Sequence, residues 1–506
     1  MKPVIDFPAS GSPAAHEQFI KGIVALHNSA YEDAADDFRS AEALDPDFVM
    51  AYWGEAMSFN HPFWNEQDIS HARQALAKLG PTRSARAAKA RTPREREYLS
   101  AIETLYGEGD KDARDFAFRD AMHALSVHYP NDTEASLFYA LSLLGTIRSI
   151  DHSYSIQMQA AAILKPILEK YPNHPGALHY FIHANDDPEH AHLALAAARR
   201  YEKVAGDSFH ALHMPSHIYI QLGMWADSAR VNQAAFDASD RHMKAKGQTV
   251  AFRDYHSLDW LMYSQLQLAE YRKARESAYL MLEAAMQPNV PGGMKGEAAV
   301  FAAKFAVETH QWDVLDPFPA VNHTPELLYA QGMAALHRND VARAMVVGRA
   351  LDALSQQTAA TGRRMQAGID DALKNEIASA IALQQHHPVE AQRFAAESVK
   401  YEALMEFPSG PPDVVKPAYE FYGETLLALN KPAQAAEQFS IALKRMPKRA
   451  LSLLGLARAR AAQKDTAGAA KTYAELAHIW ANADPDLPEV QEVRSKLAAS
   501  AKASKP

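Results

Sequence analysis

Residues 432–447 have the sequence PAQAAEQFSIALKRMP, and residues 31–48 have the sequence YEDAADDFRSAEALDPDF. In both stretches an alanine is followed by a phenylalanine, then by a second alanine, then by a proline, at identical offsets. The later pattern returns after 34 residues, where Tyr473 takes the place of Phe439. A fixed period of this length, with apolar residues at helical spacing, predicts an array of helix pairs.

The pattern resembles the tetratricopeptide repeat, which has small residues where two helices cross and an aromatic residue in the second helix. A proline closes the unit, since it cannot continue the helix. The resemblance covers most of residues 16–480 and is specific at the two ends. It implies an all-α fold, a tetratricopeptide-like helix-turn-helix solenoid that forms a right-handed superhelix with a concave groove for ligands.

Loops and composition divide the chain into six predicted segments. These are an N-terminal extension (1–15), N-terminal repeats (16–165), central histidine-rich repeats (166–285), degenerate helical repeats (286–410), C-terminal repeats (411–482), and a C-terminal helix with its tail (483–506).

The composition excludes several classes of protein. The net charge of −9 and the pI near 6.2 argue against a dedicated nucleic-acid binder, which usually carries a basic field. The chain has no cysteine, which excludes disulfides, thiolate zinc sites and thiol nucleophiles. Phosphate-loop, GxGxxG, HExxH and GxSxG motifs are also missing, which argues against an ordinary nucleotide enzyme or a serine hydrolase.

The N-terminus, MKPVIDFPASGSPAAHEQF, lacks an apolar signal core. No segment reaches the roughly 18 uninterrupted apolar residues that a membrane helix needs. We therefore expect a soluble protein with no membrane partner, cytoplasmic as given, or periplasmic if a leader has been removed.

Two histidine pairs are the strongest functional signal. His179 and His183 are four residues apart, as are His213 and His217, and the two pairs are offset by 34 residues. With 23 histidines in 506 residues, about one such pair is expected by chance, so the offset of one repeat is the informative part. Residues four apart share a helix face, so neighbouring helices would present all four imidazoles at matching heights.

Four converging imidazoles predict a transition-metal site with His179, His183, His213 and His217 as ligands. A nitrogen-only set suits copper, zinc, nickel or iron and disfavours calcium and magnesium. The alternative is that these histidines cap helices, fill polar gaps or bind a peptide carboxylate. Pro215 leaves the helix between His213 and His217 intact only if it lies in the first turn.

The repeat register implied by the resemblance adds three groove residues. His213 and His217 would be the fifth and ninth residues of their repeat, which face the groove in this family. In the next repeat, His256, Asp259 and Tyr263 would take the second, fifth and ninth positions beside the four histidines. We expect these three residues to contact a bound cofactor or ligand.

Several residues near the histidine pairs or elsewhere in the chain are further candidates for the site or for ordinary structural roles. Asp186 could orient an imidazole, whereas Asp187, before a proline, is the better candidate for a helix cap. His210 could join the ligands by proximity, and His174 is expected in a loop. Lys416 and Glu420 are candidate groove charges, although a solvated pair is the more ordinary interpretation.

The segments HYFIHANDDPEHA, ALHMPSHIYIQLGMW and FPSGPPDVVKP resemble stretches of uncharacterised bacterial tetratricopeptide-repeat proteins. The resemblance implies a histidine-lined groove and no established activity. The sequence thus favours a repeat metalloprotein, with a metal-dependent oxidoreductase or hydrolase acting on a small molecule as an open question. The alternative is a metal-free scaffold that binds a peptide or partner protein. The oligomeric state is not predicted.

Overall fold

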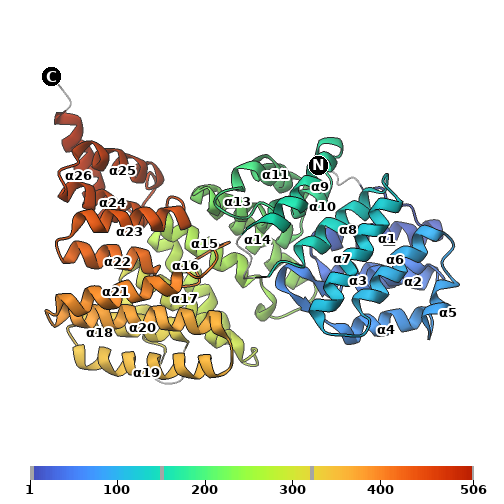
Figure 1. The fold of residues 1–506 in the computed structure, drawn as a ribbon, viewed down its shortest axis with the longest axis horizontal. Helices are drawn as coiled ribbons and strands as arrows, with labels where there is room; N and C mark the ends of the chain where they lie inside the picture. Colours follow the sequence, from blue (N-terminus) through green and yellow to red (C-terminus); the bar gives the residue numbers. More distant parts are fainter. Residues whose placement is uncertain (1–4, 149–152, 319–323, 504–506) are drawn as a thin grey trace. The chain divides into compact units, whose positions relative to one another are not determined.

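The computed structural model describes residues 5–148, 153–318 and 324–503. The chain divides into two compact units, Met1–Ile218 and Tyr219–Pro506, and each is described by itself. The all-α fold class is confirmed: helices follow one another along both units (Figure 1). The division falls inside the predicted central segment 166–285, and the finer segment boundaries stay predictions.

The first unit contains helix pairs and one short two-stranded ribbon. Its elements are α1 (Pro13–His27), α2 (Tyr31–Leu44), α3 (Val49–Met57), β1 (Asn60–His61), η1 (Pro62–Trp64), β2 (Glu66–Gln67), α4 (Ile69–Leu79), α5 (Arg83–Ala87), α6 (Pro93–Leu105), α7 (Lys111–His128), α8 (Thr133–Leu144), α9 (Ser155–Lys170), α10 (Pro175–His183), α11 (Ala191–Val204) and α12 (Phe209–His213), with α13 (Pro215–Gln221) crossing into the second unit.

The second unit continues the same pattern. Its elements are α14 (Trp225–Ala245), η2 (Val250–Phe252), α15 (Tyr255–Gln267), α16 (Tyr271–Ala285), α17 (Gly293–Thr309), η3 (Trp312–Leu315), α18 (Pro325–His337), α19 (Val341–Ala360), α20 (Arg364–Gln384), α21 (Pro388–Glu402), α22 (Ala418–Ala428), α23 (Pro432–Arg445), α24 (Ala450–Ala462), α25 (Thr466–Ile479) and α26 (Pro488–Ala503).

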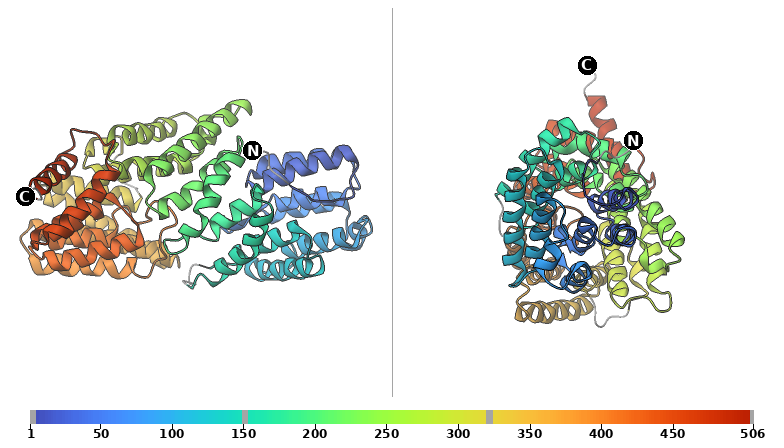
Figure 2. Two further views of the ribbon diagram at one scale, coloured as in Figure 1. Left: turned by 90° about the horizontal axis from the view of Figure 1, so that it is seen from above. Right: turned by 90° about the vertical axis from the view of Figure 1, so that its right-hand side faces the viewer.

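Helices that are consecutive in sequence pack side by side in both units, as the views in Figure 2 also show. The phenylalanine of the repeat pattern is the residue that fits them together. Phe439 of α23 lies against Gly423 of α22 and Gly455 of α24, where an added Cβ at Gly455 would fall 2.2 Å from the ring. Phe38 of α2 is fully buried and meets Gly54 in the same way. Small residues are therefore required where the helices cross, as the repeat pattern predicts.

In the second unit the last helices pack back against α15. The backbone N–H of Ala450 donates to Gln267 Oε1 (2.9 Å), and Trp480 Nε1 donates to the Gln267 carbonyl (3.0 Å). Buried apolar residues of α15 to α18 and of α24 to α26 belong to one continuous core. Helices far apart in sequence thus share a single interior.

This interior contains a network of buried charges. Arg449 is fully buried and donates to Glu308 (2.6 Å) and Glu420 (2.8 Å), while Lys416 donates to Glu420 (2.8 Å). Burial alone would raise the pKa of Glu420, but Arg449 and Lys416 outweigh it and lower that pKa to about 2. Lys416 is 6% exposed and Glu420 is fully buried, so interpreting them as a solvated pair is wrong.

No helix within the described residues combines the length and apolar character needed to cross a membrane.

Candidate metal centre

The first histidine pair lies on α10 in the first unit. The helix begins at Pro175 and is capped by His174, whose Nδ1 accepts from the backbone N–H of Ala177. His179 is fully buried, and its Nδ1 lies 2.6 Å from the carbonyl oxygen of His27. Since a carbonyl only accepts, Nδ1 carries the proton and Nε2 carries the lone pair. Burial lowers the pKa of His179 to about 3, so its imidazole is neutral at pH 7.

His183 lies one turn further along α10. Its ring stacks on Phe63 with centroids 3.6 Å apart, and its centroid is 5.0 Å from that of His179. Among the described residues, no hydrogen-bond partner is found for its buried Nε2 atom. Burial and the neighbouring histidines hold the pKa of His183 well below its usual value. A buried nitrogen without a partner is costly, and a bound cation would satisfy it.

His210 of α12 joins this pair, as its position near His213 allowed. One ring nitrogen from each of His179, His183 and His210 lies within 4.8 Å of the other two. The Nε2 atoms of His179 and His210 are 3.4 Å apart, and Trp64 packs against the His210 ring at 5.3 Å. Phe63 and Trp64 of η1 therefore supply aromatic walls for His183 and His210.

The second pair follows on α12 and α13. Pro215 begins α13, so the chain is divided into two helices between His213 and His217. The two imidazoles still meet, with Nε2 atoms 3.2 Å apart. His217 Nδ1 donates to Asp186 (2.6 Å), and the His217 ring is 5.5 Å from that of His183. The structure therefore brings the five histidines close together, and we call them the histidine cluster. Their nitrogens converge in separate groups, and within the described residues no single group contains all four predicted ligands.

Asp186 and Asp187, which follow the first histidine pair, have different partners. Asp187 accepts from the backbone N–H groups of Glu189 (2.8 Å) and His190 (2.9 Å) in the turn before α11. The N-cap of α11 is His190, so the prediction of Asp187 as a helix cap followed by a proline in the first turn is wrong. Asp186 orients the His217 ring instead. A carboxylate on the second ring nitrogen of a histidine is the usual neighbour of a metal ligand.

The three predicted groove residues of α15 lie in the second unit. Asp259 accepts from Lys304 (2.6 Å). Tyr263 is buried, and its hydroxyl accepts from Arg449 (3.3 Å) at the edge of the charged network. His256 occupies the first turn of the same helix. Their role as contacts for a cofactor beside the histidines stays a prediction.

A second cluster in the first unit has no sequence signal. Glu134 is fully buried and accepts from His27 Nε2 (2.8 Å) and His174 Nε2 (2.9 Å). His27 Nδ1 also contacts the hydroxyl of Tyr180 (2.9 Å), so both of its nitrogens are engaged. Burial would raise the pKa of Glu134, but the two imidazoles lower it to about 2. His174 lies in the turn before α10, as predicted, where it is buried, caps the helix and has a carboxylate partner.

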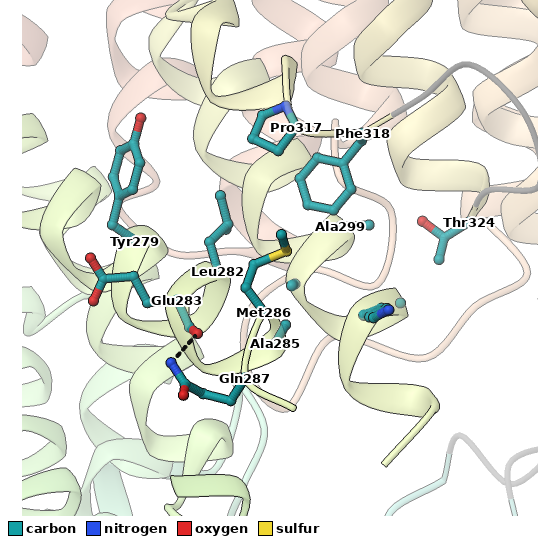
Figure 3. Close-up of a pocket in the computed structure, with 13 residues that line it drawn as sticks. Tyr279, Leu282, Glu283, Ala285, Met286, Gln287, Ala299, Pro317, Phe318 and Thr324 are labelled. Carbon is teal, nitrogen blue, oxygen red and sulfur yellow. Dashed lines mark hydrogen bonds between the residues drawn. The ribbon is translucent and has the colours of Figure 1, made fainter. Parts of the chain in front are cut away.

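The second unit also has a large apolar cavity of about 780 Å³ beside α16 and α17. Figure 3 shows Leu282, Met286 and Phe318 in its wall, with Tyr279 and Glu283 nearby. Its lining is mainly apolar, so it could pack against a ligand but has few polar or ionisable side chains that could bind a metal or take part in catalysis. The histidine cluster is the better candidate site.

Comparison with known proteins identifies the repeats. The family described as tetratricopeptide repeat matches residues 423–484, which span most of α22 and all of α23, α24 and α25. Residues 423–484 carry tetratricopeptide repeats. The predicted family is therefore confirmed over the stretch PAQAAEQFSIALKRMP, residues 432–447. A search of curated proteins finds no significant match to the chain.

Several solved structures are similar to this chain. A tetratricopeptide repeat protein from Parabacteroides merdae is 13% identical, with 58% of this chain and 100% of that chain covered and a TM-score of 0.30. Yeast Tom70 is 12% identical, with 97% and 96% covered and a TM-score of 0.29. A human IFIT1 dimer with m7Gppp-AAAA is 10% identical, with 98% and 96% covered and a TM-score of 0.36. Values this low transfer neither a ligand nor an activity.

Proposed function

We propose that this tetratricopeptide repeat protein binds a transition metal ion through its histidine cluster. The observation that carries the proposal is the convergence of His179, His183 and His210, whose ring nitrogens lie within 4.8 Å of one another. The buried Nε2 of His183, for which the described residues offer no partner, supports it. A cation at this point would replace the missing hydrogen bond with a coordinate bond.

The protonation states favour a cation over an anion. His179 is held neutral by burial, with its proton on Nδ1 toward the His27 carbonyl. Its Nε2 lone pair is thus available without the loss of a proton. Metal binding normally competes with protons for imidazole, so a depressed pKa increases the fraction of ligand that is ready at pH 7.

The ligand type restricts the metal. Imidazole nitrogen suits copper(II), zinc, nickel and iron(II), whereas calcium and magnesium require oxygen. An ion with three imidazole ligands and an open position could activate water or oxygen, as a metal-dependent hydrolase or oxidoreductase requires. A catalytic role on a small molecule is therefore an extension of the proposal.

The test uses the full chain, expressed without a histidine tag, stripped with chelator and reloaded with Zn²⁺. Elemental analysis after desalting is expected to find at least one ion per chain. His183→Asn should reduce the affinity for Zn²⁺ at least tenfold, because a ligand is lost. His386→Asn, at an adjacent-histidine site outside the cluster, is the control and should leave binding unchanged. Metal content far below one per chain after reloading would refute the proposal.

The family match favours a second function. Tetratricopeptide repeats commonly bind peptides, and residues 423–484 match that family. In this alternative the chain is a metal-free scaffold, and a partner peptide remains bound in excess chelator. Loss of the partner on metal removal would argue against it.

A further inference from the structure

The histidine cluster contains two close nitrogen–nitrogen contacts rather than one. The Nε2 atoms of His179 and His210 are 3.4 Å apart, and those of His213 and His217 are 3.2 Å apart. Each contact has its own pair of rings. The two pairs meet where the His183 and His217 rings approach, with centroids 5.5 Å apart.

In each contact, one of the two Nε2 atoms carries a lone pair instead of a proton. His179 donates its Nδ1 proton to the His27 carbonyl, and His217 donates its Nδ1 proton to Asp186. A neutral imidazole has one proton, so both Nε2 atoms face their partners as acceptors. A proton on Nε2 of His210 or His213 would make its contact an ordinary N–H···N hydrogen bond. Where the partner carries no such proton, the two lone pairs repel each other and a cation must lie between the nitrogens.

The separations fit a cation. Two imidazole nitrogens bound to one tetrahedral ion at roughly 2.0–2.1 Å are about 3.3 Å from each other. Both observed contacts are close to this value. His183 adds a third nitrogen to the first contact, since it lies within 4.8 Å of both His179 and His210.

We propose that the cluster binds two transition metal ions. His179, His183 and His210 hold one ion, and His213 and His217 hold the other, with Asp186 orienting His217. This inference rests on the proposed function and specifies its stoichiometry. The competing arrangements are one ion in one contact with an N–H···N hydrogen bond in the other, or a hydrogen bond in both contacts and no ion.

The experiment counts Zn²⁺ in the stripped and reloaded full chain by elemental analysis. The wild-type chain is expected to retain two ions. The double variant His213→Asn, His217→Asn should retain one, and His179→Asn, His210→Asn should also retain one. The matched control, His386→Asn with His387→Asn, should retain two. Far-UV circular dichroism checks that each variant keeps its helices.

Each outcome separates the two proposals. One ion in the wild-type chain overturns the two-ion inference and leaves metal binding intact, whereas no ion overturns both. Loss of both ions from either double variant overturns the division into two sites. Because His179 is fully buried and its replacement could unfold α10, the single variant His210→Asn, at a half-buried ring, repeats the measurement for the first site. It should bind the first ion at least tenfold more weakly and leave the second unchanged.

Discussion

At the scale of single residues, the first unit is organised around buried imidazoles whose protons are assigned by their partners. Glu134 accepts from His27 and His174, and the backbone carbonyl of His27 accepts from His179. Glu134 thus holds the side chain of His27 in place, and the backbone carbonyl of His27 orients His179, a predicted metal ligand. Positioning of the cluster depends on this contact.

Glu134→Gln is expected to destabilise the protein by about 3 kcal/mol, because a buried imidazole N–H loses its charged hydrogen-bond acceptor. Glutamine has one acceptor oxygen, so one of the two histidine N–H groups would face an NH₂ donor. Urea unfolding at pH 7.5 measures the change. The control is Glu97→Gln, which alters an exposed carboxylate–histidine pair with His128 and should cost less than about 1 kcal/mol. Equal costs for the two variants would contradict this account.

Stability should fall on acidification. Burial lowers the folded-state pKa values of His27 and His179, the latter to about 3, below the ordinary value of about 6.5. Between these values the unfolded chain binds protons that the folded chain does not, so the free energy of unfolding decreases as the pH falls.

The measurement is the urea midpoint of the chelator-treated chain at pH 7.5, 6 and 5. We expect the midpoint to decrease across this range and to decrease less in His179→Asn. An unchanged or rising midpoint would show that these imidazoles are not buried in their neutral form.

At the scale of helices, two repeats at opposite ends of the sequence use the same contact. Phe38 and Phe439 each fill the space left by glycines on the neighbouring helices. The turn into α23 has Asn430 in the left-handed region, at φ 56°, which asparagine tolerates better than most residues. Repetition of these local rules explains why the helix pairs recur.

Gly455→Ala tests the crossing. The added methyl group would meet the Phe439 ring at 2.2 Å, so the aromatic side chain or the helix must move. Overpacking of this kind costs about 1–3 kcal/mol. Gly292→Ala is the matched control, since its backbone is helical and its added Cβ meets no atom within 4 Å. Thermal unfolding should show a clear loss for the first variant and none for the second.

At the scale of the whole molecule, the histidine cluster and the family match lie in different units. The cluster belongs to the unit Met1–Ile218, and the matched residues 423–484 belong to the unit Tyr219–Pro506. A ligand that orders the cluster should therefore act on helices outside the matched repeats.

Hydrogen exchange with and without Zn²⁺ should detect this. Peptides covering α10, α12 and α13 are expected to exchange more slowly when metal is bound, because their backbones open less often. Peptides covering α22 to α25 should exchange at unchanged rates. Equal protection of both sets would mean that the metal acts through global stability instead of at the cluster.

The sequence by itself determined the repeat fold and the two histidine pairs. Contacts between helices adjacent in sequence are made by residues at short, regular spacings, so a period of 34 residues predicts both the helix pairs and the alignment of His179 with His213. The fifth histidine, His210, could be suspected only from its closeness in sequence to His213.

Only the tertiary structure decided which polar residues are buried together. His27, Glu134 and His174 are separated by 107 and 40 residues, and no local pattern connects them. Lys416 and Glu420 have the spacing of an ordinary surface pair, yet the packing of α24 brings Arg449 to them and excludes water. Burial depends on which distant helices cover a residue, and spacing along one helix does not contain that information.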